Sequence, residues 1–396
     1  MVKRILVGLI LGAILGIAVP QATGIAILGD VFVSALKAIA PLLVFFLVVS
    51  SLCNAGKSHG GVIKTVIILY MFSTVLAAVI AVFASMAFPV KMTLANAATD
   101  TSAPQGIVEV LNNLLLNVVA NPVSSLVNAN YVGILMWAVL LGLAFRAADK
   151  MTKKVLADVA DGISMVVTWI INLAPFGIFG LVFNTVSTNG LDIFTTYGKL
   201  LLLLVGCMLF IYFVTNPLLV YWCIRQNPYP LIFHCLKRSA LTAFFTRSSA
   251  ANIPVNMKVC EEMGLDRDTY SVTIPLGATI NMDGAAITIT VMTMATAFTL
   301  GIHVDIPTAI ILSLLAALSA CGASGVAGGS LLLIPMACSL FGISDDISMQ
   351  VVAVGFIIGV VQDSVETALN SSSDLLLSAS AEFRQWRLEG KEIKFK

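Results

Sequence analysis

One carboxylate, Asp283, stands in the middle of an otherwise apolar stretch, GATINMDGAAITIT at 277–290. The residue that follows it, Gly284, weakens a helix, and Asn281 tolerates unusual backbone dihedral angles. We therefore expect an unwound turn with free main-chain carbonyl groups. Hard cations such as sodium prefer oxygen ligands from carboxylates, amides and carbonyls, as calcium and magnesium do. Asp283 and Asn281 thus predict a sodium site; the alternative is that Asp283 only pairs with Arg247.

The last apolar segment, VVQDSVETALNSSSDLLLS, carries a stripe of polar side chains. At 100° per residue, one sector roughly 100° wide contains Asp363, Glu366, Thr367, Asn370 and Asp374. The flanking residues are apolar, so the pattern predicts a helix that is buried in a bundle with this face turned inward. Asp374 and Asn370 offer a second set of oxygen ligands for a cation. The alternative is an exposed face at a helix end, which suits Asp374 best and Asp363 worst.

The elements that must position these residues are membrane-spanning helices. Of 396 residues, 59% are hydrophobic and only 11% are charged, and the mean hydropathy is +0.99. This composition predicts an integral membrane protein. A charge inside a bilayer costs about 2.5 to 3.5 kcal/mol on insertion scales, so the buried carboxylates and Arg247 require a functional explanation. Tyr70, Ser73 and Thr74 add hydroxyl groups at helical spacing, although such groups commonly bond to their own helix backbone.

The predicted fold class is all-α, with eight transmembrane helices and two re-entrant helical hairpins. Runs of about 20 apolar residues begin near Ile5, Val31, Val62, Val132, Met165, Leu200, Val272 and Met349. Two further stretches, 230–255 and 307–342, are interrupted near their middles by small and hydroxylated residues. We expect them to enter from opposite faces as inverted repeats, because non-helical backbone at membrane depth needs protein or water around it. The alternative is close helix packing through small residues.

Charge and composition restrict the remaining possibilities. Lysine and arginine occupy alternate loops, from Lys3 and Arg4 to the tail EFRQWRLEGKEIKFK, which predicts that both termini are cytoplasmic. The net charge of +1 gives no basis for nucleic-acid binding. The seven cysteines follow no metal-ligand spacing and the three histidines lie apart, so we expect no metal cluster, no organic cofactor and no catalytic centre.

With these motifs in view, the chain resembles the dicarboxylate/amino acid:cation symporter family over nearly its whole length. The strongest similarity is TRSSAANIPVNMKVCEEMGLDRDTYSVTIPLGATINMDGAA at 246–286. The resemblance implies an elevator-type fold in a homotrimer. It implies scaffold helices 1 and 2 in residues 1–60, transport-domain helix 3 in 61–92 and scaffold helices 4 and 5 in 107–190. The remaining transport domain, 198–396, would contain helix 6, both hairpins, helices 7 and 8 and a cytoplasmic tail.

The resemblance also implies three groups of sodium ligands. The first group is Tyr70, Ser73, Thr74, Asn281 and Asp283. The second is Asn370 and Asp374 with main-chain carbonyls of the seventh and eighth helices. The third is Thr279 and Met282 with the backbone of 320–323.

Substrate ligands follow from the same resemblance. Asp363 matches the acceptor of the substrate α-amino group, and Asn370 and Ser249 match residues that hold its α-carboxylate. The backbone around Val326 and Gly328 would close over the substrate. The set is completed by Arg247, Glu366 and Thr367. Pairing both ends of a zwitterion is necessary because an unpaired buried charge costs several kcal/mol, roughly.

One departure from the family concerns the substrate side chain. Members that transport acidic substrates carry an arginine where this chain has Glu366, so an acidic substrate would meet a like charge. Arg247 is expected to neutralise Glu366. We therefore expect sodium-coupled uptake of serine and threonine through a bacterial inner membrane, with alanine as an alternative substrate. A channel and an intramembrane hydrolase using Asp283 and Asp363 are the other classes considered.

Overall fold

The computed structural model describes residues 2–54, 61–94, 116, 119–190, 192–321 and 328–393, and every regular element in them is a helix. The elements on the N-terminal side are α1 Val2–Ala18, α2 Ile27–Asn54, α3 Gly61–Ala87, α5 Pro122–Val127, α6 Tyr131–Ala144, α7 Lys150–Asn172 and α8 Ala174–Asn189. Those that follow are α9 Asp192–Phe210, α10 Asn216–Ile224, α11 Tyr229–Cys235, α12 Leu241–Thr246, α13 Ser249–Glu262, α14 Arg267–Ile280, α15 Asp283–Thr299, α16 Ile306–Ala320, α17 Ile334–Ser339 and α18 Asp345–Leu388.

Length and composition make six helical runs of the described chain able to cross a membrane. They are Thr23–Asn54, Gly61–Ala87, Lys150–Asn172, Thr195–Ile224, Arg267–Thr299 and Asp345–Leu388. Four apolar helices are shorter: Arg4–Ala18, Gly133–Ala147, Ala174–Thr188 and Ile306–Ala320. These runs support the predicted membrane protein. The run expected from Met165 differs, because it is divided at Leu173 between α7 and α8. Pro175 lies in the first turn of α8 and cannot donate a main-chain hydrogen bond there.

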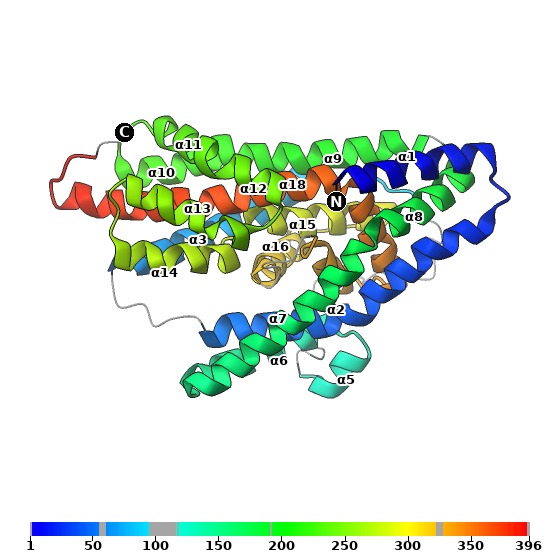
Figure 1. The fold of residues 1–396 in the computed structure, drawn as a ribbon, viewed down its shortest axis with the longest axis horizontal. Coiled ribbons are helices and arrows are strands. Elements are labelled where there is room, and N and C mark those ends of the chain that lie inside the picture. The colour runs from blue at the N-terminus through cyan, green and yellow to red at the C-terminus, as the bar shows by residue number, and fades with distance from the viewer. Residues whose placement is uncertain are drawn as a thin grey trace.

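The helices form two packed groups. In the first group, α2 contacts α6, α7 and α8, and α1 lies along α8. The second contains α3 and the helices from α9 to α18, with α9, α10 and α18 along the long axis of the molecule and α7 and α8 in an oblique line across it (Figure 1). The first group packs through glycine: a Cβ at Gly180 would lie 2.5 Å from the main-chain N of Gly29. Small residues at such contacts let helix backbones approach closely.

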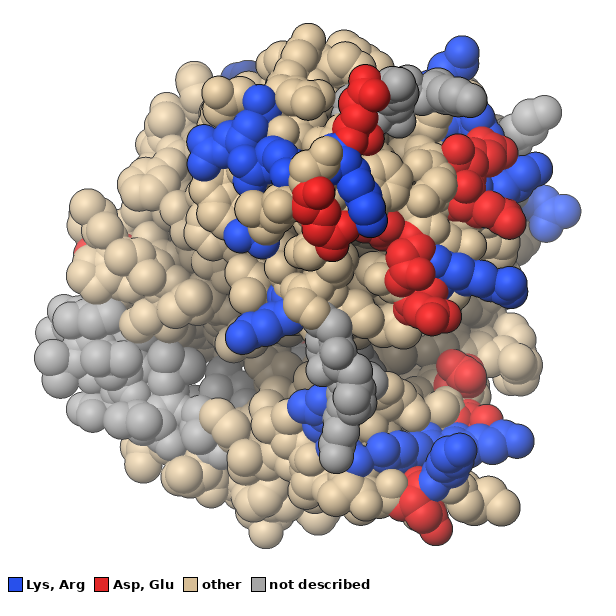
Figure 2. Space-filling view, turned by 90° about the vertical axis from the view of Figure 1, so that its left-hand side faces the viewer, with Lys and Arg blue, Asp and Glu red and all other residues tan. Residues whose placement is uncertain are grey.

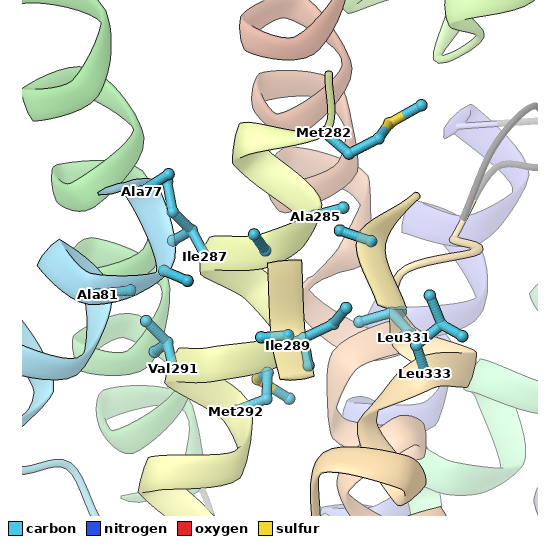
Figure 3. Packing of buried hydrophobic residues seen from close by; sticks show 14 of the residues in the cluster. Ala77, Ala81, Met282, Ala285, Ile287, Ile289, Val291, Met292, Leu331 and Leu333 are labelled. Atoms are coloured by element: carbon cyan, nitrogen blue, oxygen red, sulfur yellow. The ribbon is translucent and has the colours of Figure 1, made fainter. Parts of the chain in front are cut away.

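The most enclosed helix of the second group is α15, which contacts α3, α9, α16, α17 and α18. Ala77 and Ala81 of α3 face Ile287 and Val291 of α15 (Figure 3). Small alanines opposite branched side chains bring the two helices close together. The N-terminal end of α15, where Asp283 lies, is therefore held by packing on every side.

Three helix interruptions converge near this point. Between α14 and α15, Asn281 and Met282 have non-helical ψ angles of 79° and 52°, which confirms the expected unwound turn. The first interrupted stretch folds back at Arg247, whose φ of 52° is left-handed, and α13 begins after Ser248. The second folds back between α16 and α17, which contact each other. Both stretches are therefore helix pairs.

Charged residues gather at one end of the molecule. Figure 1 places the end of α2, the start of α3, the link from α13 to α14 and the end of α18 at its left-hand side. Figure 2 looks onto this end and shows lysines, arginines, aspartates and glutamates spread across it. The basic loops that the sequence assigns to the cytoplasm thus include several that share one face.

Candidate functional site

The carboxylate of Asp283 is fully buried and accepts hydrogen bonds from α3. Ser73 Oγ donates to Oδ2 at 2.7 Å, and Thr74 Oγ1 lies 3.1 Å from Oδ1. Thr74 Oγ1 also lies 3.0 Å from the carbonyl O of Tyr70 and accepts from the main-chain N–H of Met282 at 3.3 Å. The hypothesis that Asp283 only pairs with Arg247 is wrong, because the arginine binds another carboxylate. The hydroxyl groups of α3 face this carboxylate across the helix contact.

Asn281 joins this region to the second predicted ligand set. Its Nδ2 donates to Asp374 Oδ1 at 2.9 Å. Its Oδ1 is buried and has no hydrogen-bond partner among the described residues. An unpartnered buried amide oxygen is costly unless a cation or water binds it. Asn281 thus offers a free oxygen ligand beside a carboxylate, as hard cations prefer.

Tyr70 lies with Asp374 rather than with Asp283. Its hydroxyl donates to the carbonyl O of Asp374 at 2.9 Å and lies 2.7 Å from Ser378 Oγ. The packing leaves no room on α14, because a Cβ at Gly277 would lie 2.8 Å from both Asp374 Cγ and Tyr70 Oη. Asp374 is 1% exposed, so the alternative of an exposed helix end is wrong.

Asn370 lies one helical turn before Asp374 on α18, where it closes the unwound turn between α14 and α15. Its Oδ1 accepts from the main-chain N–H of Gly284 at 2.7 Å, and its Nδ2 lies 3.5 Å from Met282 Sδ. The main-chain carbonyl O of Asn370 lies 3.5 Å from Asn281 Nδ2. A side chain of α18 therefore caps the first turn of α15.

Asp363 connects α18 to both hairpins. Arg247 Nη2 and Nε lie 2.5 and 2.6 Å from Asp363 Oδ2, and the N–H of Gly328 donates to Oδ1 at 3.3 Å. Thr367 Oγ1 donates to the Asp363 carbonyl O at 2.8 Å. Gly328 has a φ of 72°, which favours glycine. Arg247 and Gly328 both have left-handed backbone conformations, and both contact the carboxylate of Asp363. The two hairpins therefore meet at this carboxylate.

Glu366 is not neutralised by Arg247, which corrects the expectation from sequence. Its Oε2 accepts from Thr288 Oγ1 at 2.7 Å, from Ser330 Oγ at 2.9 Å and from Gln362 Nε2 at 2.5 Å. These donors belong to α15, the second hairpin and α18 itself. Three neutral donors hold the carboxyl group, whereas the arginine remains on Asp363.

Sequence reasoning missed these three donors. Gln362 lies 100° behind Asp363 on the helix, which places it outside the polar sector predicted from the sequence. Thr288 is one of several threonines on α15, and no periodic signal marks it. A buried glutamate without a cation at i±3 or i±4 is the signal that would have prompted a search for neutral donors.

The other predicted ligands occupy varied surroundings. Ser249 is buried in the first turn of α13, and Met282 is buried in the unwound turn. Thr279 is half-buried, and its hydroxyl donates to the carbonyl O of Leu276 at 2.7 Å. Cys321 follows the last residue of α16, and its Sγ lies 3.7 Å from the carbonyl O of Ile280. This contact places the second hairpin beside the unwound turn. Val326 and residues 322–323 of the predicted backbone ligands lie outside the described residues.

A further polar cluster fixes the first hairpin to α18. Asn252 Nδ2 donates to Ser239 Oγ at 2.9 Å and to Ser371 Oγ at 2.8 Å, and Asn256 Nδ2 donates to the Ser371 carbonyl O at 2.8 Å. All four residues are buried. The cluster therefore joins the two arms of the hairpin to each other and its second arm, α13, to α18.

Broken helices that meet around buried carboxylates are the architecture with which secondary transporters bind ions and substrates. The chain belongs to the sodium:dicarboxylate symporter family, whose model matches residues 1–382. It is 58% identical over 394 residues to the serine/threonine transporter SstT of Bifidobacterium adolescentis, covering 99% of this chain and 92% of that protein.

Two streptococcal relatives carry the same name. The serine/threonine transporter SstT of Streptococcus thermophilus is 55% identical over 388 residues, which cover 98% of this chain and 96% of that protein. The protein of that name from Streptococcus agalactiae is 57% identical over 383 residues, covering 96% and 95%. The family resemblance inferred from the motifs is confirmed over the whole length of the chain.

Proposed function

We propose that this protein is a sodium-coupled symporter that imports serine and threonine. The observation that carries the proposal is the convergence of α3, the unwound turn and α18 on buried carboxylates beside an unpartnered amide oxygen, Asn281 Oδ1. The names of the relatives support the choice of substrates. Neutral hydroxy amino acids also agree with the buried carboxyl group of Glu366, which disfavours a second negative charge.

Sodium travels in this proposal as a substrate rather than as a resident cofactor. Asp283 supplies one set of oxygen ligands with Ser73, Thr74 and the main chain of the unwound turn. Asp374 supplies another with Asn281, while Asn370, Tyr70, Thr279 and Met282 shape the space between them. Among the described residues, the hydrogen bonds to the carboxylates of Asp283 and Asp374 come from neutral side chains. A sodium ion beside them would compensate their negative charges.

The amino acid binds where the hairpins meet. Its α-amino group replaces the Arg247 guanidinium on Asp363, because both groups are cations that can pair with this buried carboxylate. Asn370 and Ser249 face the α-carboxylate, and the hairpin carrying Gly328 closes over the substrate. Exchange of one cation for another keeps the buried carboxylate of Asp363 paired throughout.

Transport follows an elevator cycle in this proposal. The group of α1, α2, α6, α7 and α8 is the scaffold, and the group of α3 and α9 to α18 is the moving domain. Eight membrane crossings, a homotrimer, an inner-membrane location and cytoplasmic termini complete the assignment. The lysines and arginines at the charged end in Figure 2, where α18 ends, favour a cytoplasmic position for that end. For each net positive charge moved inward, the membrane potential supplies about 2.3 kcal/mol of free energy per 100 mV.

The decisive experiment is uptake of labelled serine into proteoliposomes with an inward sodium gradient. Accumulation above equilibrium that depends on sodium is the expected result, with threonine and alanine as competitors that rank the substrates. Equal loading in sodium, potassium and choline buffers would exclude sodium coupling. Conductance without serine accumulation would favour a channel.

A further inference from the structure

A large apolar groove lies between α3 and α9, on the surface of the bundle. Its volume is about 880 Å³, and its lining comes from residues 80–90 and 199–210. Apolar side chains along its rim are exposed, with Phe83 at 56% and Leu202 at 74%. Exposed apolar side chains at this density require an apolar surrounding.

The lining of the groove includes small residues from both helices. They are Ala84 and Ala87 of α3 and Gly206 of α9. A Cβ at Gly206 would meet no atom of the described residues within 4 Å, so none of these residues fills the space above it. The groove therefore lies between α3 and α9, and side chains of the described residues leave it open.

The dimensions of the groove fit one leaflet of a bilayer. Residues 199 to 210 of α9 rise by roughly 16 Å at 1.5 Å per residue. Half of a hydrocarbon core of ~30 Å is about 15 Å. An extended acyl chain therefore has the length needed to lie along the whole groove.

One charge completes the groove. Lys199 is the single charged residue among the thirteen described residues of the lining. It is exposed and shares its end of the groove with Phe88–Val90, where α3 terminates, because α3 and α9 run in opposite directions (Figure 1). Lysine at such a position extends its ammonium group toward the polar interface, where phosphate groups lie.

We propose that this groove is a binding site for a membrane phospholipid, with one acyl chain along α9 and the phosphate group at Lys199. The positive charge of Lys199 favours a ligand with a phosphate group over a neutral hydrophobic ligand. The length of the groove favours an extended acyl chain over a compact ligand. The inference rests on the membrane location in the proposed function but not on any particular transported substrate. Because α3 also carries Ser73 and Thr74, the lipid would pack on the helix that donates hydrogen bonds to Asp283.

The experiment uses the full-length protein in liposomes containing a phospholipid with a photoreactive diazirine near the end of its acyl chain. Irradiation should label peptides from 80–90 and 199–210. Gly206→Trp should reduce this labelling at least fivefold by filling the groove. Gly198→Trp is the matched control, because a Cβ at Gly198 also meets no atom within 4 Å and this residue of α9 does not line the groove.

The phosphate contact is tested separately by native mass spectrometry of the detergent-purified protein. Lys199→Gln should lower retention of phospholipid by about fivefold, the effect of one basic residue near a phosphate surface. Lys64→Gln, at the opposite end of α3, should leave it unchanged. Three results would each overturn the proposal. The first is labelling of Gly206→Trp at the wild-type level, and the second is phospholipid retention by Lys199→Gln at the wild-type level. The third is cross-linking of these peptides to a second copy of the chain. Neither readout requires uptake activity, so failure here is distinguishable from failure of the proposed function.

Discussion

Arg247 at the tip of the first hairpin and Asp363 on α18 form an ion pair, with Nη2 2.5 Å from Oδ2 and side chains only 13% and 5% exposed. The two residues are 116 positions apart in the chain. Each charge is compensated almost entirely by the other, since a buried charge left alone is strongly destabilising. The pair therefore couples the position of the hairpin tip to the carboxylate that the proposed substrate needs.

Replacing Asp363 should reduce transport strongly without preventing folding. In Asp363→Asn the α-amino group of serine loses a charged acceptor, worth about 1.5 to 3 kcal/mol, so uptake should fall at least tenfold, roughly. The single variant also leaves Arg247 unpaired and should unfold at a lower temperature. The double variant Arg247→Gln/Asp363→Asn should regain thermal stability but not uptake. Serine uptake at the wild-type rate in either variant would remove Asp363 from the site.

Removing one hydroxyl group from α3 should weaken sodium binding. Ser73→Ala deletes the 2.7 Å hydrogen bond to Asp283, so we expect the sodium concentration for half-maximal uptake to rise about tenfold. Ser85→Ala is a matched control, because the hydroxyl of this buried serine of α3 donates to its own helix, at Ala81 O, and not to Asp283 among the described contacts. An unchanged sodium requirement in Ser73→Ala would contradict a role for Asp283 in sodium binding.

The environment of Glu366 predicts which amino acids compete with serine. Its carboxyl group is buried and bonded to neutral donors, so aspartate should compete poorly and lysine should not compete at all. In Glu366→Gln the repulsion of an acidic side chain is removed, and inhibition of serine uptake by aspartate should increase severalfold. Effective competition by lysine or arginine in the wild-type protein would show that Glu366 selects cations, and the proposed substrates would be wrong.

The close packing at Gly277 predicts a large effect from a single methyl group. Gly277→Ala would place Cβ 2.8 Å from Asp374 Cγ and Tyr70 Oη, which forces Asp374 to move. We expect a loss of about 1 to 3 kcal/mol in stability, as in other overpacked cores. Stabilisation by sodium in thermal unfolding should also diminish. Gly198→Ala serves as the control, since that Cβ has open space. Wild-type stabilisation by sodium in Gly277→Ala would exclude Asp374 from a sodium site.

Acid should loosen the start of α16 through its N-cap. Hydrogen bonds from the side chain and main chain of Thr308 hold the pKa of Asp305 below its ordinary value. A depressed pKa means that the cap stabilises the helix above the unfolded pKa of about 4 and that this contribution is lost as the pH falls through the lower, folded value. Asp305→Asn keeps a capping oxygen and should remove the pH dependence.

Amide hydrogen exchange of residues 308–310 measures the effect of this cap. Protection should decrease with acid in the wild-type protein but remain constant in Asp305→Asn. Asp305→Ala should lower protection at neutral pH as well, because loss of an N-cap costs about 1 kcal/mol. Equal protection in all three proteins across the acid range would contradict a role for Asp305 in starting the helix.

Local patterns predicted local features well. The unwound turn at Asn281 and Met282 followed from asparagine and glycine beside Asp283, because backbone preference acts over a few residues. The burial of the α18 stripe followed from helical periodicity. Partner choice was less predictable: Arg247 was expected near Glu366 and binds Asp363 instead, three residues away on the same helix. One turn separates the two carboxylates, and sequence spacing does not resolve which one a distant hairpin tip reaches.

The sequence by itself determined that this protein is helical, membrane-embedded and supplied with buried carboxylates, because hydropathy, periodicity and composition are summed along the chain. Only the tertiary structure decided which donor meets each carboxylate: Ser73 meets Asp283, Asn281 meets Asp374, and Thr288 with Gln362 meets Glu366. These contacts depend on the angles and offsets at which separate helices pack, to within about an ångström. Such offsets arise from the fit of many side chains across helix interfaces, and no single segment encodes them.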